Sequence, residues 1–501
     1  MIALIAASLL TLGLSSAIQD PQTATIQLPD SQRVTGTLLA DINGDQVSDL
    51  ILACRHTVTG KRSLRMYERN KKSPAFSSSP SRPPYEVDSD VIAFTFCDCE
   101  KTPGCELILL TAEQVVAVVA GKDGAPTYTR LANHQLIWPA ADASLVVPLP
   151  DAAIDIDGDN QSDLMLPSPD GWSVWFQDVD GEESSFTHQS QIKLPQRQNS
   201  IGKSARGRGA SSGSRSFGMR MRGGRPGGMG GRLVSTSTRS PQCQAIDLYG
   251  NGNLDLVTYR NGSMHAGIQL DPRSFTQREQ SLPLPENRLK AIDLAFNVQW
   301  SDINGDSKSD LLLTTSAQRD GDVEARVDLF LADGNGGWAD KPNARLRMQT
   351  LARKPQLVDA DGDGKDDLVC ITLRTSAMAN ITSLKSSSFD AQLNIYRNSG
   401  EEFVTPSLLS RPLPLVTNSR LQKPFLIVRP GRRGRPGDVL LHIDGHIERR
   451  FLNIKNKALQ MAKSDARSPV PEKSTILVAD EFGDDLLIIS SSEVRHLRFR
   501  R

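Results

Sequence analysis

The residues with the clearest chemical pattern are aspartates, which recur with asparagine and glycine in a fixed phrase. The phrase D-x-[D/N]-G-D-x-x-x-D reads DINGDQVSD from residue 41, DIDGDNQSD from 155, DINGDSKSD from 302 and DADGDGKDD from 359. Side-chain oxygens recur at positions 1, 3, 5 and 9 of each copy, and the carbonyl of position 7 could add another. Hard oxygen ligands, with neither histidine nor cysteine among them, are those that Ca²⁺ takes in proteins.

The four complete copies predict four structural calcium sites. Carboxylates packed this closely repel one another strongly unless a cation lies among them, so bound metal is the economical interpretation. The predicted ligands are Asp41, Asn43, Asp45, the Val47 carbonyl and Asp49; Asp155, Asp157, Asp159, the Gln161 carbonyl and Asp163; Asp302, Asn304, Asp306, the Lys308 carbonyl and Asp310; and Asp359, Asp361, Asp363, the Lys365 carbonyl and Asp367.

Two other interpretations of the phrase compete with metal binding. Asp, Asn and Gly are common turn formers, so a single copy would say little about metal; four copies at a near-constant spacing favour the metal interpretation. An EF-hand needs a glutamate at position 12 and flanking helices. Position 12 is leucine or cysteine in these four copies, and β-prone residues surround it, which excludes the EF-hand.

Weaker copies of the phrase complete a series of eight. DLYGNGNLD from residue 247 keeps the first and last aspartates and is expected to bind calcium weakly. The copies at Asp98, Pro430 and Asp480 have lost too many ligands to count as sites. The eight copies start at residues 41, 98, 155, 247, 302, 359, 430 and 480, and removal of residues 196–240 shortens the longest interval from 92 to 47.

The segments around each copy must position these loops, and they have the pattern of β-strands. A short apolar run precedes each copy, another follows it, and a third alternating run comes next, with no long segment of helical periodicity. A repeat of about 55 residues with four strands is the size of a propeller blade. We predict an all-β propeller with four-stranded blades, eight of them rather than seven, in which TATIQLPDSQRV at 23–34 supplies the strand that the last copy lacks.

The four complete copies, read with their following strands, resemble the FG-GAP or VCBS repeats of the integrin-α-like β-propellers. The resemblance rests on DINGDQVSDLIL, DIDGDNQSDLML, DINGDSKSDLLL and DADGDGKDDLVC, and its periodicity covers nearly the whole mature chain. It implies that the calcium loops join the first strands of each blade on one face, and that partners engage the opposite face or the side. Most blades lack recognisable FG and GAP elements.

The charge of the chain is unevenly distributed. Its 58 Lys and Arg balance its 58 Asp and Glu, which excludes a uniformly basic nucleic-acid binder, and no nucleic-acid partner is expected. Residues 196–240 hold ten basic residues and no acidic one, so the rest of the chain carries 48 basic against 58 acidic residues. This Gly, Arg and Ser-rich segment is expected to be a disordered insert within the propeller.

The N-terminus is expected to be a secretory signal. Residues 1–17, MIALIAASLLTLGLSSA, form an apolar run closed by small residues, which leaves 18–501 as the propeller. No later stretch approaches the ~20 apolar residues of a membrane-spanning helix. We therefore expect a secreted protein, extracellular or periplasmic, without a membrane span, and a monomer.

Three of the six cysteines, Cys97, Cys99 and Cys105, lie in or beside the weak second copy. One hypothesis is that a Cys99–Cys105 disulfide staples this turn where calcium holds the others; the alternative, buried or free thiols, stays open.

The functional prediction is a secreted calcium-binding propeller that serves as an adhesion or binding scaffold for an extracellular protein or a polysaccharide. The alternative is an extracellular propeller enzyme of the polysaccharide lyase or hydrolase type, with calcium in a structural role. No nucleophile, paired-acid or catalytic-metal pattern stands out in the sequence, so no catalytic residue is assigned.

Overall fold

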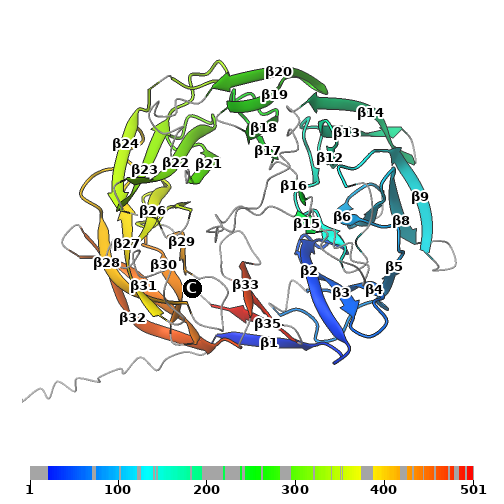
Figure 1. The fold of residues 1–501 in the computed structure, drawn as a ribbon, viewed down its shortest axis with the longest axis horizontal. Helices are drawn as coiled ribbons and strands as arrows, with labels where there is room; N and C mark the ends of the chain where they lie inside the picture. Colours follow the sequence, from blue (N-terminus) through cyan, green and yellow to red (C-terminus); the bar gives the residue numbers. More distant parts are fainter. Residues whose placement is uncertain are drawn as a thin grey trace, which may run out of the picture.

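Every copy of the repeat forms a separate antiparallel sheet, and the sheets follow one another around a ring (Figure 1). The structure is a computed structural model of the chain. The described residues are 21–499 with gaps at 70–74, 101–102, 121–125, 139–141, 143–144, 181–182, 194–217, 221–236, 240–242, 261–262, 282–294, 320–321, 340, 350, 352–353, 374–386, 418–425, 432–433, 444, 456–457, 472–473, 479–484 and 491–492.

The first four blades each run in sequence order from an inner strand outward. Their strands are β2 (Gln32–Ala40), β3 (Asp49–His56), β4 (Arg62–Tyr67) and β5 (Tyr85–Val87); β6 (Ala93–Cys97), β7 (Glu106–Leu110), β8 (Gln114–Ala120) and β9 (Pro126–Asn133); β11 (Ala153–Ile154), β12 (Asp163–Ser168), β13 (Gly171–Asp180) and β14 (Glu183–Lys193); and β17 (Cys243–Ile246), β18 (Asp255–Arg260), β19 (Ser263–Asp271) and β20 (Ser274–Ser281). Blade 2 gains a fifth strand, β10 (Val147–Pro148), which pairs parallel with β6.

The next three blades repeat this order, and the eighth is built from both ends of the chain. The strands are β21 (Ala295–Ser301), β22 (Asp310–Arg319), β23 (Asp322–Phe330) and β24 (Ala344–Gln349); β25 (Gln356–Val358), β26 (Asp367–Leu373), β27 (Ser387–Tyr396) and β28 (Leu409–Thr417); β29 (Leu426–Arg429), β30 (Asp438–Ile443), β31 (His446–Lys455) and β32 (Ala458–Pro469); and β33 (Thr475–Val478), β34 (Asp485–Ile489), β35 (Glu493–Arg498) and β1 (Gln22–Gln27).

The ring closes as the sequence predicts. Strand β1 pairs antiparallel with β35, from Gln22 opposite Arg498 to Gln27 opposite Glu493. The N-terminal strand thereby completes the blade whose other strands come from the C-terminus. The predictions of an all-β propeller, of four-stranded blades and of eight of them are confirmed.

The core lies between neighbouring blades. The second strand of each blade is flanked by sheets on both faces, so it reads as a continuous apolar run rather than as an alternating one. In β3, for example, Leu50, Ile51 and Leu52 are all fully buried. Leu312 of blade 5 and Leu368 of blade 6 belong to one apolar cluster, which shows that burial joins adjacent blades.

Several predictions fall on residues outside the described part of the chain. The signal segment 1–17 lies there, as does the insert at 196–240 except for two short strands, β15 (Gly218–Arg220) and β16 (Ser237–Arg239), which pair antiparallel. The predicted disorder of the insert stays a prediction. Among the described residues no helix is long and apolar enough to cross a membrane.

The disulfide hypothesis is wrong. Cys99 and Cys105 are free thiols, as are the other four cysteines. The turn that they flank is held by the backbone instead, because the Cys105 amide donates a 2.9 Å hydrogen bond to the Asp41 carbonyl of the preceding loop.

Candidate metal sites

The aspartate phrases all occupy the same place in their blades, between the first and the second strand. Because these blades share one strand order, the loops fall at equivalent places around the ring. The loops with complete or weak phrases span residues 41–48, 155–162, 247–254, 302–309 and 359–366. The predicted position between the first strands is therefore where the structure has them.

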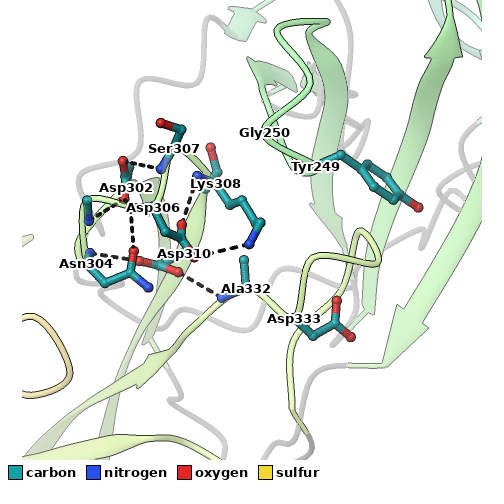
Figure 2. A network of polar contacts seen from close by, with 12 residues as sticks. Tyr249, Gly250, Asp302, Asn304, Asp306, Ser307, Lys308, Asp310, Ala332 and Asp333 are labelled. Carbon is teal, nitrogen blue, oxygen red and sulfur yellow. Dashed lines mark hydrogen bonds and ion pairs between the residues drawn. The ribbon is translucent and has the colours of Figure 1, made fainter.

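The first aspartate of each phrase organises its loop, as the loop of blade 5 illustrates (Figure 2). Asp302 Oδ1 accepts hydrogen bonds from the amides of Gly305 at 2.7 Å and Asp306 at 3.0 Å, and its Oδ2 accepts one from Ser307 at 2.8 Å. Gly305 has φ +81° and Ser307 has φ +67°, so the chain turns tightly enough to direct successive amides at one carboxylate. Glycine at position 4 is what this left-handed turn requires.

The same arrangement recurs in the other loops. Asp41, Asp155, Asp247 and Asp359 each accept a hydrogen bond from the amide of position 4 and another from the amide of position 6, at 2.6–3.0 Å. At position 7, where a carbonyl ligand is predicted, the amides of Val47, Gln161, Lys308 and Lys365 donate to the position-5 aspartates. The aspartate side chains thus hold the turn through hydrogen bonds from backbone amides.

The aspartate at position 9 is fully buried and joins the loop to the third strand of its blade. Asp163 Oδ2 accepts from the Ile156 amide at 2.9 Å, and its Oδ1 accepts from the Gln177 amide at 3.0 Å. The same two bonds, one to position 2 and one to the residue near the end of the third strand, are made by Asp49, Asp255, Asp310 and Asp367.

Burial changes the acidity of these carboxyls. It raises the pKa of Asp163 and of Asp367 to about 7, and that of Asp49 to about 6, even though the amide hydrogen bonds act in the opposite direction. A nearby cation would favour the ionised form of such a group.

Two loops bring three carboxylates together. In the first group, three carboxylate oxygens lie within 4.8 Å of one another, one each from Asp155, Asp157 and Asp159. The second group consists in the same way of Asp359, Asp361 and Asp363. Asp163 and Asp367 do not belong to these groups. In the loops of blades 1 and 5, an asparagine, Asn43 or Asn304, takes the middle position, which leaves two carboxylates and an amide.

The donor chemistry of these loops fits a hard cation such as Ca²⁺. All the side chains at positions 1, 3 and 5 offer oxygen, and the turn directs them to one side of the loop. A bound calcium ion would supply positive charge that links these oxygens and offsets their repulsion. The ligand set at positions 1, 3, 5, 7 and 9 stays a prediction, and the carboxylates at positions 1 and 9 also accept hydrogen bonds from backbone amides.

Two arginines that the sequence analysis did not identify contact the carboxylate groups. Arg273 Nε lies 2.6 Å from Asp157 Oδ2, and Arg397 Nε lies 2.7 Å from Asp361 Oδ2. These hydrogen bonds raise the pKa of both arginines above its ordinary value. The phrase itself does not predict these contacts, because Arg273 lies 116 residues after Asp157 and Arg397 lies 36 residues after Asp361.

The weak copies replace acidic side chains by other contacts. In blade 7 the loop 430–437 contains no acidic residue, and the Arg429 guanidinium, fully buried, forms two hydrogen bonds with Asp438 at the position-9 site. The amide of Gly431 donates to the Asp359 carbonyl at 2.7 Å. In blade 8, Asp485 takes the same place and pairs with Arg69 at 2.6 Å and His496 at 3.0 Å.

Outside the loops, the described surface offers little that indicates a ligand. A polar groove runs along β1 and the end of β32, lined among others by Thr23, Thr25, Gln27, Arg467 and Arg495, and no His or Tyr lines it. The large exposed apolar side chains of the described residues are scattered over different blades and form no patch: Val58, Tyr128, Leu270, Val404 and Ile454.

Comparison with known proteins supports the repeat. Residues 302–370 match a family model described as an FG-GAP-like repeat. No curated protein matches the chain in sequence.

Solved structures with a similar arrangement are distant. The Dos1 propeller is 8% identical, with 96% of this chain and 94% of that chain covered and a TM-score of 0.43. A lectin of Agrocybe aegerita that recognises non-reducing terminal N-acetylglucosamine is 11% identical, with 77% and 81% covered and a TM-score of 0.40. The exotype rhamnogalacturonan lyase YesX is 12% identical, with 96% and 76% covered and a TM-score of 0.31. TM-scores this low carry no argument about function.

Proposed function

We propose that this FG-GAP repeat protein is a secreted calcium-binding propeller that acts as an adhesion or binding scaffold for an extracellular protein or a polysaccharide. The observation that carries the proposal is the set of aspartate loops at the same place in blades 1, 3, 5 and 6, whose side chains at positions 1, 3 and 5 all offer oxygen. Their oxygen-only donor sets suit Ca²⁺ better than a transition metal.

Calcium has a structural role in this proposal. Each ion would tie together a loop that joins the first two strands of a blade, and neighbouring loops are themselves linked by the backbone. The Ser309 amide, for instance, donates a 3.0 Å hydrogen bond to the Asp247 carbonyl of the preceding blade. For a site of ~10 μM affinity in ~1 mM calcium, binding would stabilise the folded protein by roughly 2.7 kcal/mol.

Thermal unfolding of the mature chain in calcium and in EDTA tests this role. We expect chelation to lower the melting temperature by several degrees and added calcium to restore it. The double variant D41N/D45N should lose part of this difference, whereas D30N, a single Asp-to-Asn change on an exposed turn, should keep it. Identical melting curves in calcium and EDTA for the unaltered protein would contradict calcium binding.

A binding screen against glycans and extracellular proteins, with and without calcium, tests the scaffold role. The expected result is retention of one ligand class that weakens after chelation. Cleavage of a polysaccharide into shorter products would contradict a pure scaffold and favour a lyase or hydrolase. Secretion is tested separately: the exported protein should begin at Ile18, after removal of residues 1–17.

A further inference from the structure

In the loops at 155–162 and 359–366, several carboxylates lie close together and repel one another, and an arginine side chain contacts each group. Asp157 and Asp361 stand at position 3, and their side chains are only 2% and 1% exposed. Water therefore screens these charges poorly, and the carboxylates at positions 1 and 5 lie close by. Without a positive group, the ionised form of such a cluster is strongly disfavoured.

In both loops a guanidinium reaches the same atom. Arg273 Nε contacts Asp157 Oδ2 at 2.6 Å, and Arg397 Nε contacts Asp361 Oδ2 at 2.7 Å. The position-5 carboxylates are engaged more loosely, since Arg273 Nη2 lies 3.0 Å from Asp159 and Arg397 Nε lies 4.0 Å from Asp363.

The two arginines come from different places in the chain. Arg397 directly follows the third strand of its own blade and precedes Asn398, whose amide binds Asp367. In blade 3 the equivalent residue is Phe176, which precedes Gln177. Arg273 comes from the β19–β20 turn of the next blade and lies over the Phe176 ring, 5.7 Å from its centroid. Two separate routes thus deliver a guanidinium to position 3.

In the loops with asparagine at position 3, no described arginine makes this contact. Among the described residues, no ion pair involves Asp41 or Asp45, and the residue equivalent to Arg397 in blade 1 is Glu68. In blade 5 it is Leu331, and the only ion pair described for this loop is the weaker contact of Lys308 with Asp306 at 3.3 Å. Within the described part of the chain, an arginine pairs with position 3 where that residue is acidic, and none pairs with it where it is asparagine.

We propose that Arg273 and Arg397 are resident counter-cations that oppose calcium binding in the loops of blades 3 and 6. This proposal rests on the calcium-binding function proposed above. It assigns the tightest calcium site to the loop at 41–49, which has fewer carboxylates and, among the described residues, no arginine paired with them. A calcium ion entering the acid-rich loops must share or displace the guanidinium at the position-3 oxygen. Charge-assisted hydrogen bonds of this kind are among the stronger polar contacts in proteins.

Calorimetric calcium titration of the chelator-stripped mature protein tests this proposal. The variants are R273Q and R397Q, with R130Q as a matched loss of positive charge on the exposed outer strand of blade 2 and D41N/D45N to remove the site at 41–49. Each loop arginine is expected to weaken calcium binding in its own loop by about tenfold or more. R273Q and R397Q should therefore each gain affinity at one site, and R130Q should match the unaltered protein.

Thermal unfolding supplies a second readout, in which the effect of the arginine variants should depend on calcium. In EDTA, R273Q and R397Q should melt below the unaltered protein, because the carboxylates lose their counter-cation. In calcium, this deficit should shrink or disappear, since the metal takes over the charge balance. Calcium affinities that are unchanged or lower in both arginine variants would overturn the proposal, even if one variant folded poorly.

These outcomes separate the proposal from the function on which it rests. If the unaltered protein binds calcium and D41N/D45N removes its tightest site, calcium binding stands whatever the arginine variants do. If the unaltered protein binds no calcium while R273Q or R397Q does, the counter-cation role stands and calcium binding by the natural chain fails.

Discussion

Blades 6 and 7 are neighbours that hold the same loop in different ways. In blade 6, Asp367 is fixed by three backbone amides and the loop before it carries four further aspartates. In blade 7, Asp438 is fixed by the buried Arg429, and the loop before it is held by close backbone contact. A Cβ on Gly437 would lie 1.9 Å from the Arg429 carbonyl oxygen, so only glycine fits there.

The comparison separates two roles that the phrase combines. The acid at the start of the second strand has a structural role, and it is retained as Asp438 in blade 7, whose loop has lost the other acids, and as Asp485 in blade 8. The acids at positions 1, 3 and 5 are present only in some loops, and those are the residues that a cation would need. Four variants test this division, ordered by the size of the expected effect.

The largest effect should come from the buried pair of blade 7. R429M removes the charged side chain that hydrogen bonds to Asp438 and leaves that carboxylate buried, which typically costs about 3–5 kcal/mol. The urea midpoint of unfolding should fall sharply, and the second change in R429M/D438L should recover part of the loss. A fall no larger than that of R130Q would contradict the structural role of this acid in blade 7.

A smaller effect is expected from the amide-held acid of blade 3. In D163N, one side-chain oxygen still accepts a hydrogen bond, but the new NH₂ group faces an amide donor. An unsatisfied buried donor costs about 1–3 kcal/mol. Urea unfolding in EDTA measures this loss without metal effects. If D163N were as stable as D30N, the two amide bonds to Asp163 would not hold the loop.

Blade 8 should differ from the amide-held blades in its response to acid. Burial acts to raise the pKa of Asp485, but the hydrogen bond and charge of His496 and the charge of Arg69 lower it below the ordinary 3.8. A carboxyl whose pKa is lowered in the folded state stabilises the protein at pH values above its unfolded-state pKa. This stabilisation is lost as the pH falls through the folded-state pKa. Stability should therefore decline less steeply below pH ~4 in D485N than in the unaltered protein. Equal slopes would contradict this.

The smallest effect is expected from an exposed ion pair of blade 1. Lys61 and Glu86 lie 3.0 Å apart, with side chains 66% and 72% exposed. Such surface pairs contribute about 0–1 kcal/mol because water and salt screen them. E86Q should change the urea midpoint far less than R429M does, and a comparable loss would undermine the distinction between buried and exposed pairs.

The repeat was sufficient to predict the fold from the sequence. The regular spacing of the phrase gives the blade size, and the truncated last copy requires a strand from elsewhere, which Gln22–Gln27 provides. These features are local or periodic. The strand β10 of blade 2 was not predicted, because it consists of two residues that pair only after the chain has returned to β6.

The candidate sites were predictable only in part. Turn geometry follows from the local order of Asp, Asn and Gly, so the loops formed where expected. The partners of their carboxylates are set by the tertiary fold: Arg273 reaches Asp157 from the next blade, and the Asp49 carboxylate depends on the amide of Arg69 after the third strand. Cys99 and Cys105 suggested a disulfide, but a backbone bond to the neighbouring loop holds their turn.

The most direct test of the account is a crystal structure of the mature protein grown in calcium, with the ions identified by anomalous scattering. The account predicts an ion in the loop at 41–49, bound by Asp41, Asn43 and Asp45 with metal–oxygen distances of about 2.4 Å. It also predicts no ion in the loop at 430–437. Empty acidic loops at saturating calcium, or an ion in the blade 7 loop, would contradict it.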